Sequence, residues 1–126
     1  MAYQSFEELE VYQLARELRG EIYSLTKKLP VEEKFNLAGQ MRRAATSLTN
    51  NIAEGHGRYH YQENIQFCRQ SRGSLMELID DLNICIDEEY FPLDHLEFLK
   101  QKAYHLNKKL NGYILYLKKR KAEDTK

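Results

Sequence analysis

The stretch that decides the fold runs over residues 40–78 and reads QMRRAATSLTNNIAEGHGRYHYQENIQFCRQSRGSLMEL. Up to Glu54 its apolar residues recur every three or four positions, which is the spacing of one buried helix face. Gly55-His56-Gly57 then interrupts the pattern, and a second helical pattern follows with Gly73-Ser74 in its interior. The stretch therefore predicts two long helices joined by a glycine-containing turn.

A polar face runs beside the apolar face on the first of these helices. At about 100° per residue its members fall together, and they offer amides, a hydroxyl and a guanidinium rather than the Lys and Glu of an ordinary solvated face. One interpretation is a solvated face of accidental composition; the other is a hydrogen-bonded seam against another helix or subunit. In the second interpretation this face contributes Gln40, Arg43, Ser47, Asn51 and Glu54 to a structural or subunit contact. The following helix is expected to contribute Gly73, Ser74 and Glu77.

The flanking sequence predicts two more helices and the limits of all four. Ser5 and Glu8 have capping-box spacing ahead of a helix expected over 6–29, which Pro30 ends. The second helix is expected from about 31 to Gly55, with that glycine as a left-handed C-terminal residue, and the third to about 89. A heptad repeat predicts the fourth helix, through Leu96, Leu99, Ala103, Leu106, Leu110, Tyr113 and Leu117.

Helices of this length with short connections predict an all-α, antiparallel, up-down-up-down four-helix bundle. The 126 residues suit one domain, expected over 1–121, with 122–126 as a frayed C-terminal tail. Gly73 costs roughly 1 kcal/mol in a helix interior, and we expect a close approach of another helix as the compensation.

A family resemblance rests on RAATSLTNNIAEGHGR over 43–58, on Phe67 and on GSLMEL over 73–78. These motifs are similar to the signature of a four-helix bundle protein family, whose members resemble proteins encoded in intervening sequences of bacterial large-subunit ribosomal RNA genes. They are also similar to the accessory variability protein of diversity-generating retroelements. The resemblance covers nearly the whole chain, but Gln70-Ser71 stands where relatives usually carry an apolar residue and Ala.

The resemblance implies a fold and, less directly, a mode of action. Some relatives form ring-like pentamers of bundles, which implies a homo-oligomer and specifically a homopentamer. The retroelement accessory protein binds nucleic acid and a reverse transcriptase, which implies nucleic acid or a protein as partner.

Residues that carry catalysis or bind metals do not form a recognisable pattern. Bundle di-metal sites use Glu-x-x-His, and no histidine here has Glu three residues before it. His56 and His60 straddle the glycine break instead of sharing a helical face. Cys68 and Cys85 lie about 25 Å apart along one expected helix, too far for a disulfide, and are expected to be buried in a reducing compartment. We therefore predict no enzymatic activity, no metal and no cofactor.

Charge and hydropathy limit the partners. No apolar run approaches the roughly 18 residues that cross a bilayer, and the N-terminus lacks a signal pattern, so no membrane association and a cytoplasmic location are expected. The net charge is zero, which argues against blanket attraction to nucleic acid. The charge is uneven, however: residues 76–99 carry eight acidic and no basic groups, whereas residues 100–126 carry nine basic and two acidic groups.

Two functions fit this distribution. The first is a non-enzymatic oligomeric scaffold that binds nucleic acid or a ribonucleoprotein through arginine forks, lysines, and tyrosines able to stack on bases. Its candidate contacts are Arg42, Arg58, Tyr59, Arg69, Arg72, Lys118, Lys119, Arg120 and Lys121. The arginines have a structural alternative, exemplified by pairing of Arg43 with Glu54 or Glu77. The second function is a protein-interaction module without nucleic-acid binding, which salt dependence distinguishes from the first.

Overall fold

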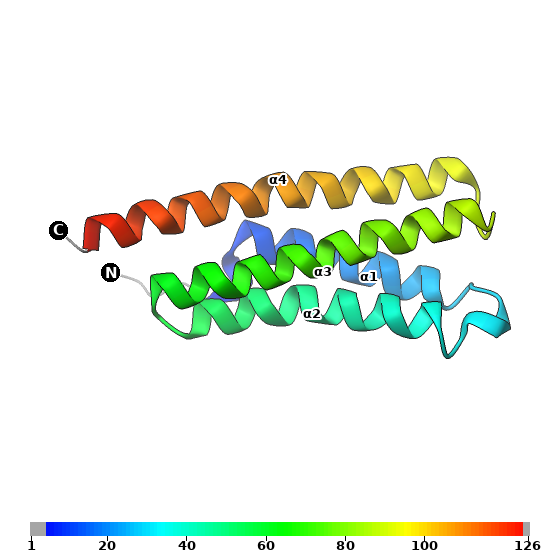
Figure 1. Cartoon of the computed structure of the whole chain (residues 1–126), viewed down its shortest axis with the longest axis horizontal. Coiled ribbons are helices and arrows are strands. Elements are labelled where there is room, and N and C mark those ends of the chain that lie inside the picture. The colour runs from blue at the N-terminus through cyan, green and yellow to red at the C-terminus, as the bar shows by residue number, and fades with distance from the viewer. Residues whose placement is uncertain (1–4, 125–126) are drawn as a thin grey trace.

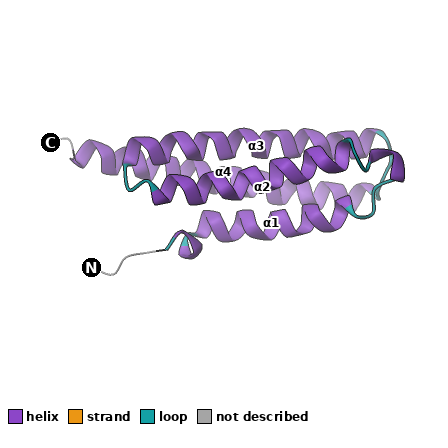
Figure 2. Cartoon of the chain, turned by 90° about the horizontal axis from the view of Figure 1, so that it is seen from below, coloured by secondary structure: helices purple, strands orange, loops and turns teal. Residues whose placement is uncertain are grey.

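The computed structural model describes residues 5–124, and within them the chain forms four α-helices, two 3₁₀-helices and no strand. Consecutive helices run in alternating directions side by side, and the connections lie at the two ends of the bundle (Figures 1 and 2). This arrangement confirms the predicted antiparallel bundle. The elements are η1 (Phe6–Glu8), α1 (Glu10–Thr26), η2 (Val31–Glu33), α2 (Leu37–Gly57), α3 (Tyr61–Asp87) and α4 (Leu93–Asp124).

The core is a single cluster to which all four helices contribute. Leu18, Leu48, Leu75 and Leu106 are each at most 2% exposed. Every residue of the heptad repeat on α4 is buried except Tyr113, which is partly buried against the cluster. α2 packs extensively against α1 and α3, and α3 against α4, whereas α1 and α4 make fewer contacts. None of the helices described over 5–124 combines the length and hydropathy that a bilayer span requires.

The first helix begins later and ends earlier than predicted. Ser5 accepts a hydrogen bond from the backbone N–H of Glu7, so it caps the short η1 rather than a long helix. Leu9 is extended, and α1 starts after it. At the other end the Thr26 hydroxyl donates to the Tyr23 carbonyl oxygen at 2.8 Å and accepts from Arg42 Nε at 3.0 Å. α1 ends at this contact, so Pro30 is not what ends it.

The second helix begins at Leu37, six residues after the predicted start. Val31 and Phe35 are 81% and 92% exposed, so a helix through them would have had no core to bury its apolar side chains. Instead, η2 places Glu33 where it accepts a 2.6 Å hydrogen bond from the hydroxyl of Tyr90 in the α3–α4 connection. This bond lowers the pKa of Glu33 and raises that of Tyr90 to about 12. It ties together two connections at one end of the bundle.

Gly55 does not end the second helix, and its φ is not positive. It lies inside α2, where an added Cβ would stand 2.8 Å from Asn64 Oδ1 and 2.9 Å from Phe67 Cβ. α2 continues to Gly57, and the left-handed residue of the turn is Tyr59, with φ 53°. The close approach of helices that we expected at Gly73 is therefore found at Gly55.

Gly73 and the end of α4 also differ from expectation. Within residues 5–124, an added Cβ at Gly73 would meet no atom within 4 Å, so none of the described helices compensates for this glycine. α4 remains helical through Asp124, three residues beyond the boundary placed at 121. The last two residues of the expected tail lie outside the described residues.

Candidate nucleic-acid interface and polar seams

A polar seam lies between α2 and α3, and it contains part of the set named for the hydrogen-bonded interpretation. The Ser74 hydroxyl donates to Ser47 Oγ at 2.9 Å across the two helices. Asn51 Nδ2 donates to Ser47 Oγ and to the Ser47 carbonyl oxygen, both at 2.9 Å. Ser71, which departs from the residue that relatives usually carry, is buried and donates a 2.7 Å hydrogen bond to the Leu48 carbonyl oxygen. These hydroxyls satisfy one another at the helix contact.

The charged members of the predicted seam do not bridge the helices. Glu54 forms an ion pair at 3.2 Å with Arg58, which follows the C-terminal end of the same helix, and not with Arg43. Within residues 5–124, Arg43 and Glu77 are exposed and form no ion pair, so the alternative that pairs Arg43 with Glu54 or Glu77 is not found within one chain. Gln40 donates to Asn36 one turn earlier rather than across the seam.

A buried carboxyl group lies further along the side of α3 that faces α2. Asp81 lies seven residues after Ser74, hence on the same helix side, and is 7% exposed. Burial, together with the nearby negative charges of Asp80 and Glu77, raises its pKa to about 6. Part of its population therefore keeps a proton near neutral pH.

A second polar seam, between α1 and α2, was not predicted. Arg19 Nη1 donates to Thr49 Oγ1 at 2.9 Å, and the hydroxyls of Tyr23 and Thr46 share a hydrogen bond. Arg42 places its guanidinium over the Tyr23 ring, 4.6 Å from the centroid. Its Nε bond to Thr26 completes the seam, which makes Arg42 a structural residue rather than a free nucleic-acid contact. The threonines on the small-residue side of α2 were the available sequence signal.

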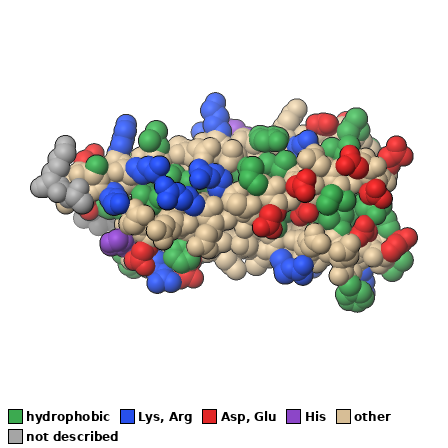
Figure 3. Space-filling view, in the orientation of Figure 1, with side chains coloured by type: hydrophobic (Ala, Val, Ile, Leu, Met, Phe, Trp, Pro, Cys, Tyr) green, Lys and Arg blue, Asp and Glu red, His purple; other side chains and the backbone are tan. Residues whose placement is uncertain are grey.

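A basic face forms where the start of α3 lies beside the end of α4. Arg69, Lys118 and Lys121 line a hollow of about 400 Å³ together with Gln62, Ile65 and Ala122. Lys121 Nζ donates to Gln62 Oε1 at 2.6 Å, which fixes α4 against α3. Figure 3 shows Lys and Arg gathered over this half of the α3–α4 face, with most Asp and Glu over the other half.

The other predicted contacts divide between this basic face and elsewhere. Arg72 lies beside it and donates to Asn111 Oδ1 at 2.8 Å. Lys119 is exposed on α4, and Arg120 donates to the Tyr61 hydroxyl at 3.4 Å. Arg58 forms ion pairs with Glu54 and, at 3.7 Å, with Glu63, and its guanidinium lies over the Phe67 ring. Tyr59 is exposed in the α2–α3 turn.

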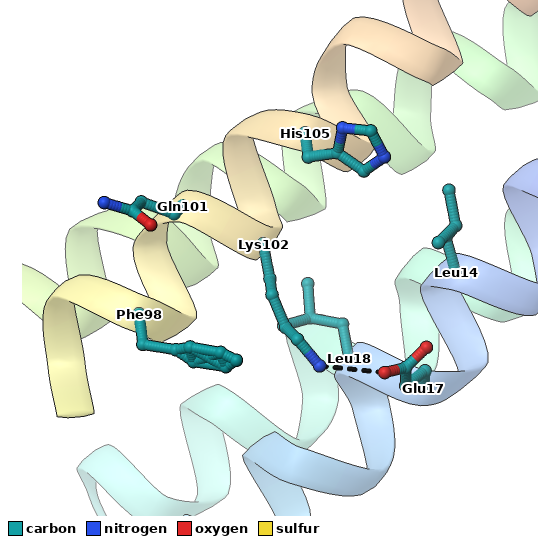
Figure 4. Close-up of a pocket in the computed structure, with 7 residues that line it drawn as sticks. All are labelled: Leu14, Glu17, Leu18, Phe98, Gln101, Lys102 and His105. Carbon is teal, nitrogen blue, oxygen red and sulfur yellow. Dashed lines mark hydrogen bonds and ion pairs between the residues drawn. The ribbon is translucent and has the colours of Figure 1, made fainter.

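The contact between α1 and α4 is hollow, and a lysine of α4 bridges it to two carboxylates of α1. A hollow of about 270 Å³ lies at this contact, and Lys102 of α4 reaches Glu17 of α1 there (Figure 4). Lys102 Nζ lies 2.8 Å from Glu17 Oε1 and 2.9 Å from Glu21 Oε1. The bond to Lys102 lowers the pKa of Glu17, and the two carboxylates raise that of Lys102. The pair bridges the two helices.

The buried thiols are held in their protonated form. Burial raises the pKa of Cys68 to about 12 and that of Cys85 to about 11. Both cysteines are free. Among residues 5–124 no group of three His, Cys, Asp or Glu side chains is arranged to hold a metal ion.

These helices, seams and faces define a four-helix bundle protein, and comparison with known proteins places it further. The family described as 23S rRNA-intervening sequence protein matches over residues 7–112. The chain belongs to this family. A crystal structure of a protein with unknown function from the S23 ribosomal protein family of Bacteroides thetaiotaomicron is similar, with a TM-score of 0.77 and 26% sequence identity. The match covers 82% of this chain and 97% of that one. No curated protein matches the chain.

Proposed function

We propose that the protein is a non-enzymatic, self-associating helical scaffold that binds nucleic acid through the phosphates, with the basic face of α3 and α4 as the contact. The observation that carries the proposal is the hollow shared by Arg69, Lys118 and Lys121, where cations from two helices converge. Arg forks match phosphate oxygens, and lysines contribute as point charges. The family name supports an RNA-related setting but names no ligand.

The lysines of this face have few competing carboxylates. Lys118 and Lys119 are exposed, and Lys121 is held by the neutral Gln62. Among the described residues, Arg120 is the one member of the cluster with an acidic partner, Glu123, at 3.7 Å. A phosphate backbone that crosses this face would therefore meet cations whose charge is still available, despite the zero net charge of the chain.

The test is a fluorescence-anisotropy titration with labelled single-stranded RNA and with duplex DNA. If a single strand neutralises about four cations, its affinity should fall about 50-fold between about 50 and 200 mM salt. The variant Lys118→Gln/Lys121→Gln should bind more weakly and with a shallower salt dependence. Lys27→Gln/Lys28→Gln, which removes two exposed cations from the end of α1, is the matched control and should bind like the wild type.

A second function is favoured by the division of charge into two halves. The acidic residues 76–99 and the basic residues 100–126 present surfaces that another protein, or another copy, would complement. Absence of nucleic-acid binding at low salt would reject the first function and leave this one.

Self-association and location complete the proposal. A homopentamer is what the family resemblance implies, and light scattering on the purified protein measures the mass that decides it. A cytoplasmic location is consistent with the two buried free thiols, because the cytoplasm keeps thiols reduced.

A further inference from the structure

The outward side of α3 carries a glycine that nothing in the chain explains. Ser74 is directed at α2, through Ser47, and Arg72 at α4, through Asn111, so Gly73 between them faces away from the bundle. It is exposed, and an added Cβ would meet no atom within 4 Å. Glycine weakens a helix interior, and its usual structural benefit is that another backbone can approach closely.

The residues around Gly73 differ in charge on its two sides. At about 100° per residue they lie within about 60° of Gly73, so they share its outward direction. Arg69 lies one turn before it, while Glu77 and Asp80 lie one and two turns after it. Met76, 40% exposed, is the large apolar side chain beside the glycine. We call this surface the α3 stripe: Arg69, Gln70, Gly73, Met76, Glu77 and Asp80.

We propose that the α3 stripe binds the α3 stripe of a second copy of this chain, with the two helices antiparallel and crossing at Gly73. This proposal rests on the self-association proposed above and assigns a surface to it. A two-fold axis through the crossing places the basic half of each stripe over the acidic half of the other. Arg69 then lies opposite Asp80 and Met76 of the second copy.

Charge selects this arrangement over the alternative. A parallel pairing would stack Arg69 on Arg69 and Asp80 on Asp80, which like-charge repulsion disfavours. The missing Cβ at Gly73 lets the two backbones approach closely at the crossing. Met76 then covers the aliphatic part of Arg69 on the second copy, which removes apolar surface of both from water.

A two-fold contact has a defined stoichiometry. The same patch is used by both copies, so the contact closes after two chains, or pairs two larger assemblies, and does not by itself build a ring. Arg69 also borders the basic face, but Lys118 and Lys121 do not belong to the stripe. Variants of the α4 lysines therefore test nucleic-acid binding separately from the stripe.

The test uses charge reversal in two separate variants and then in their mixture. Light scattering gives the mass of the wild type, of Arg69→Glu and of Asp80→Lys over about 1 to 100 µM protein. We expect each variant alone to fall to half the wild-type mass, from a dimer to a monomer or from two paired assemblies to a single one, with an affinity between copies at least about tenfold weaker. An equimolar mixture should regain the wild-type mass, because both contacts of the mixed pair again join opposite charges.

Two further variants separate interface effects from folding. Gly73→Gln adds a side chain where the isolated chain has open space, so the helix content and the melting temperature of the variant should not fall. The mass of its assembly should nevertheless be half that of the wild type. Lys27→Glu reverses an exposed charge directly after α1 and should leave the mass unchanged.

Three results would overturn the proposal. A multimeric wild type whose mass ignores Arg69→Glu and Gly73→Gln would place self-association on another surface. A mixture that fails to regain mass would exclude the antiparallel pairing. A wild type that is monomeric throughout would reject both the stripe and self-association, while nucleic-acid binding in the anisotropy titration would still stand or fall by itself.

Discussion

The contact between α2 and α3 and the contact between α1 and α4 show two ways in which one bundle joins neighbouring helices. The first is close and internally satisfied, with Gly55 against Phe67 and hydroxyl groups paired at the interface. The second is hollow and is bridged by long side chains such as Lys102. The difference teaches that small residues decide where two helices approach each other closely. Where two helices stay further apart, long charged side chains span the gap between them. We therefore expect substitutions in the two contacts to differ in the size of their effects.

The largest contrast should come from adding one methyl group at two glycines. Gly55→Ala places a Cβ into Asn64 and Phe67 and should lower the free energy of unfolding by about 1–3 kcal/mol. Gly112→Ala, on α4 beside the hollow contact, meets no atom within 4 Å and should raise it by about 0.5–1 kcal/mol. Urea unfolding measures both values. Equal changes would show that the two contacts do not differ in closeness.

The next effect concerns the buried carboxyl on the α2 side of α3. The folded pKa of Asp81 lies near 6, above its ordinary value, so the folded state binds this proton more tightly than the unfolded state does. Its contribution to stability therefore falls as pH rises from about 4 to 7. Asp81→Asn should add about 2 kcal/mol at pH 7 and much less at pH 4. Unfolding curves of the wild type and of Asp81→Asn at both pH values measure this effect. A difference in the free energy of unfolding between the two proteins that is the same at pH 4 and pH 7 would contradict the prediction.

A smaller loss should follow removal of one buried hydroxyl. Ser71→Ala deletes the bond to the Leu48 carbonyl oxygen and should cost about 1 kcal/mol. Ser24→Ala removes an exposed hydroxyl from α1 and is the matched control, with no expected change. Urea midpoints that coincide for the two variants would show that the hydroxyl bond adds nothing to the close contact.

The smallest effect should come from the bridge across the hollow contact. Lys102→Met keeps most of the aliphatic length but removes the charge that joins Glu17 and Glu21. Exposed ion pairs contribute little, so the melting temperature should fall by less than about 3 °C. The difference from the wild type should shrink in high salt, and a salt-independent loss would mean that packing rather than charge is involved.

The sequence predicted the bundle and placed Ser47 and Asn51 on one polar face, because helical periodicity reports which residues share a face, but it left open whether another helix or another subunit covers that face. It misplaced the helix ends because these depend on partners distant in the chain, as Tyr90 does for Glu33 and Arg42 for Thr26. It assigned Gly55 to a turn and Gly73 to a close contact, since spacing does not reveal which glycine faces a neighbouring helix. The basic face was found in part, as Arg69 and the α4 lysines meet there, whereas Arg42 and Arg58 have partners inside the chain.

The hollow contact between α1 and α4 also has a consequence for local unfolding. α1 is the shortest of the four helices, and three hollows of about 270, 500 and 580 Å³ follow its α4 side. Its release breaks fewer close contacts than the release of α3, which is packed on both sides. Backbone amides of α1 should therefore exchange with solvent deuterium through an opening of lower free energy than those of α3. In such an opening α2, α3 and α4 remain together, and the polar side of α2 that binds α1 is exposed to solvent.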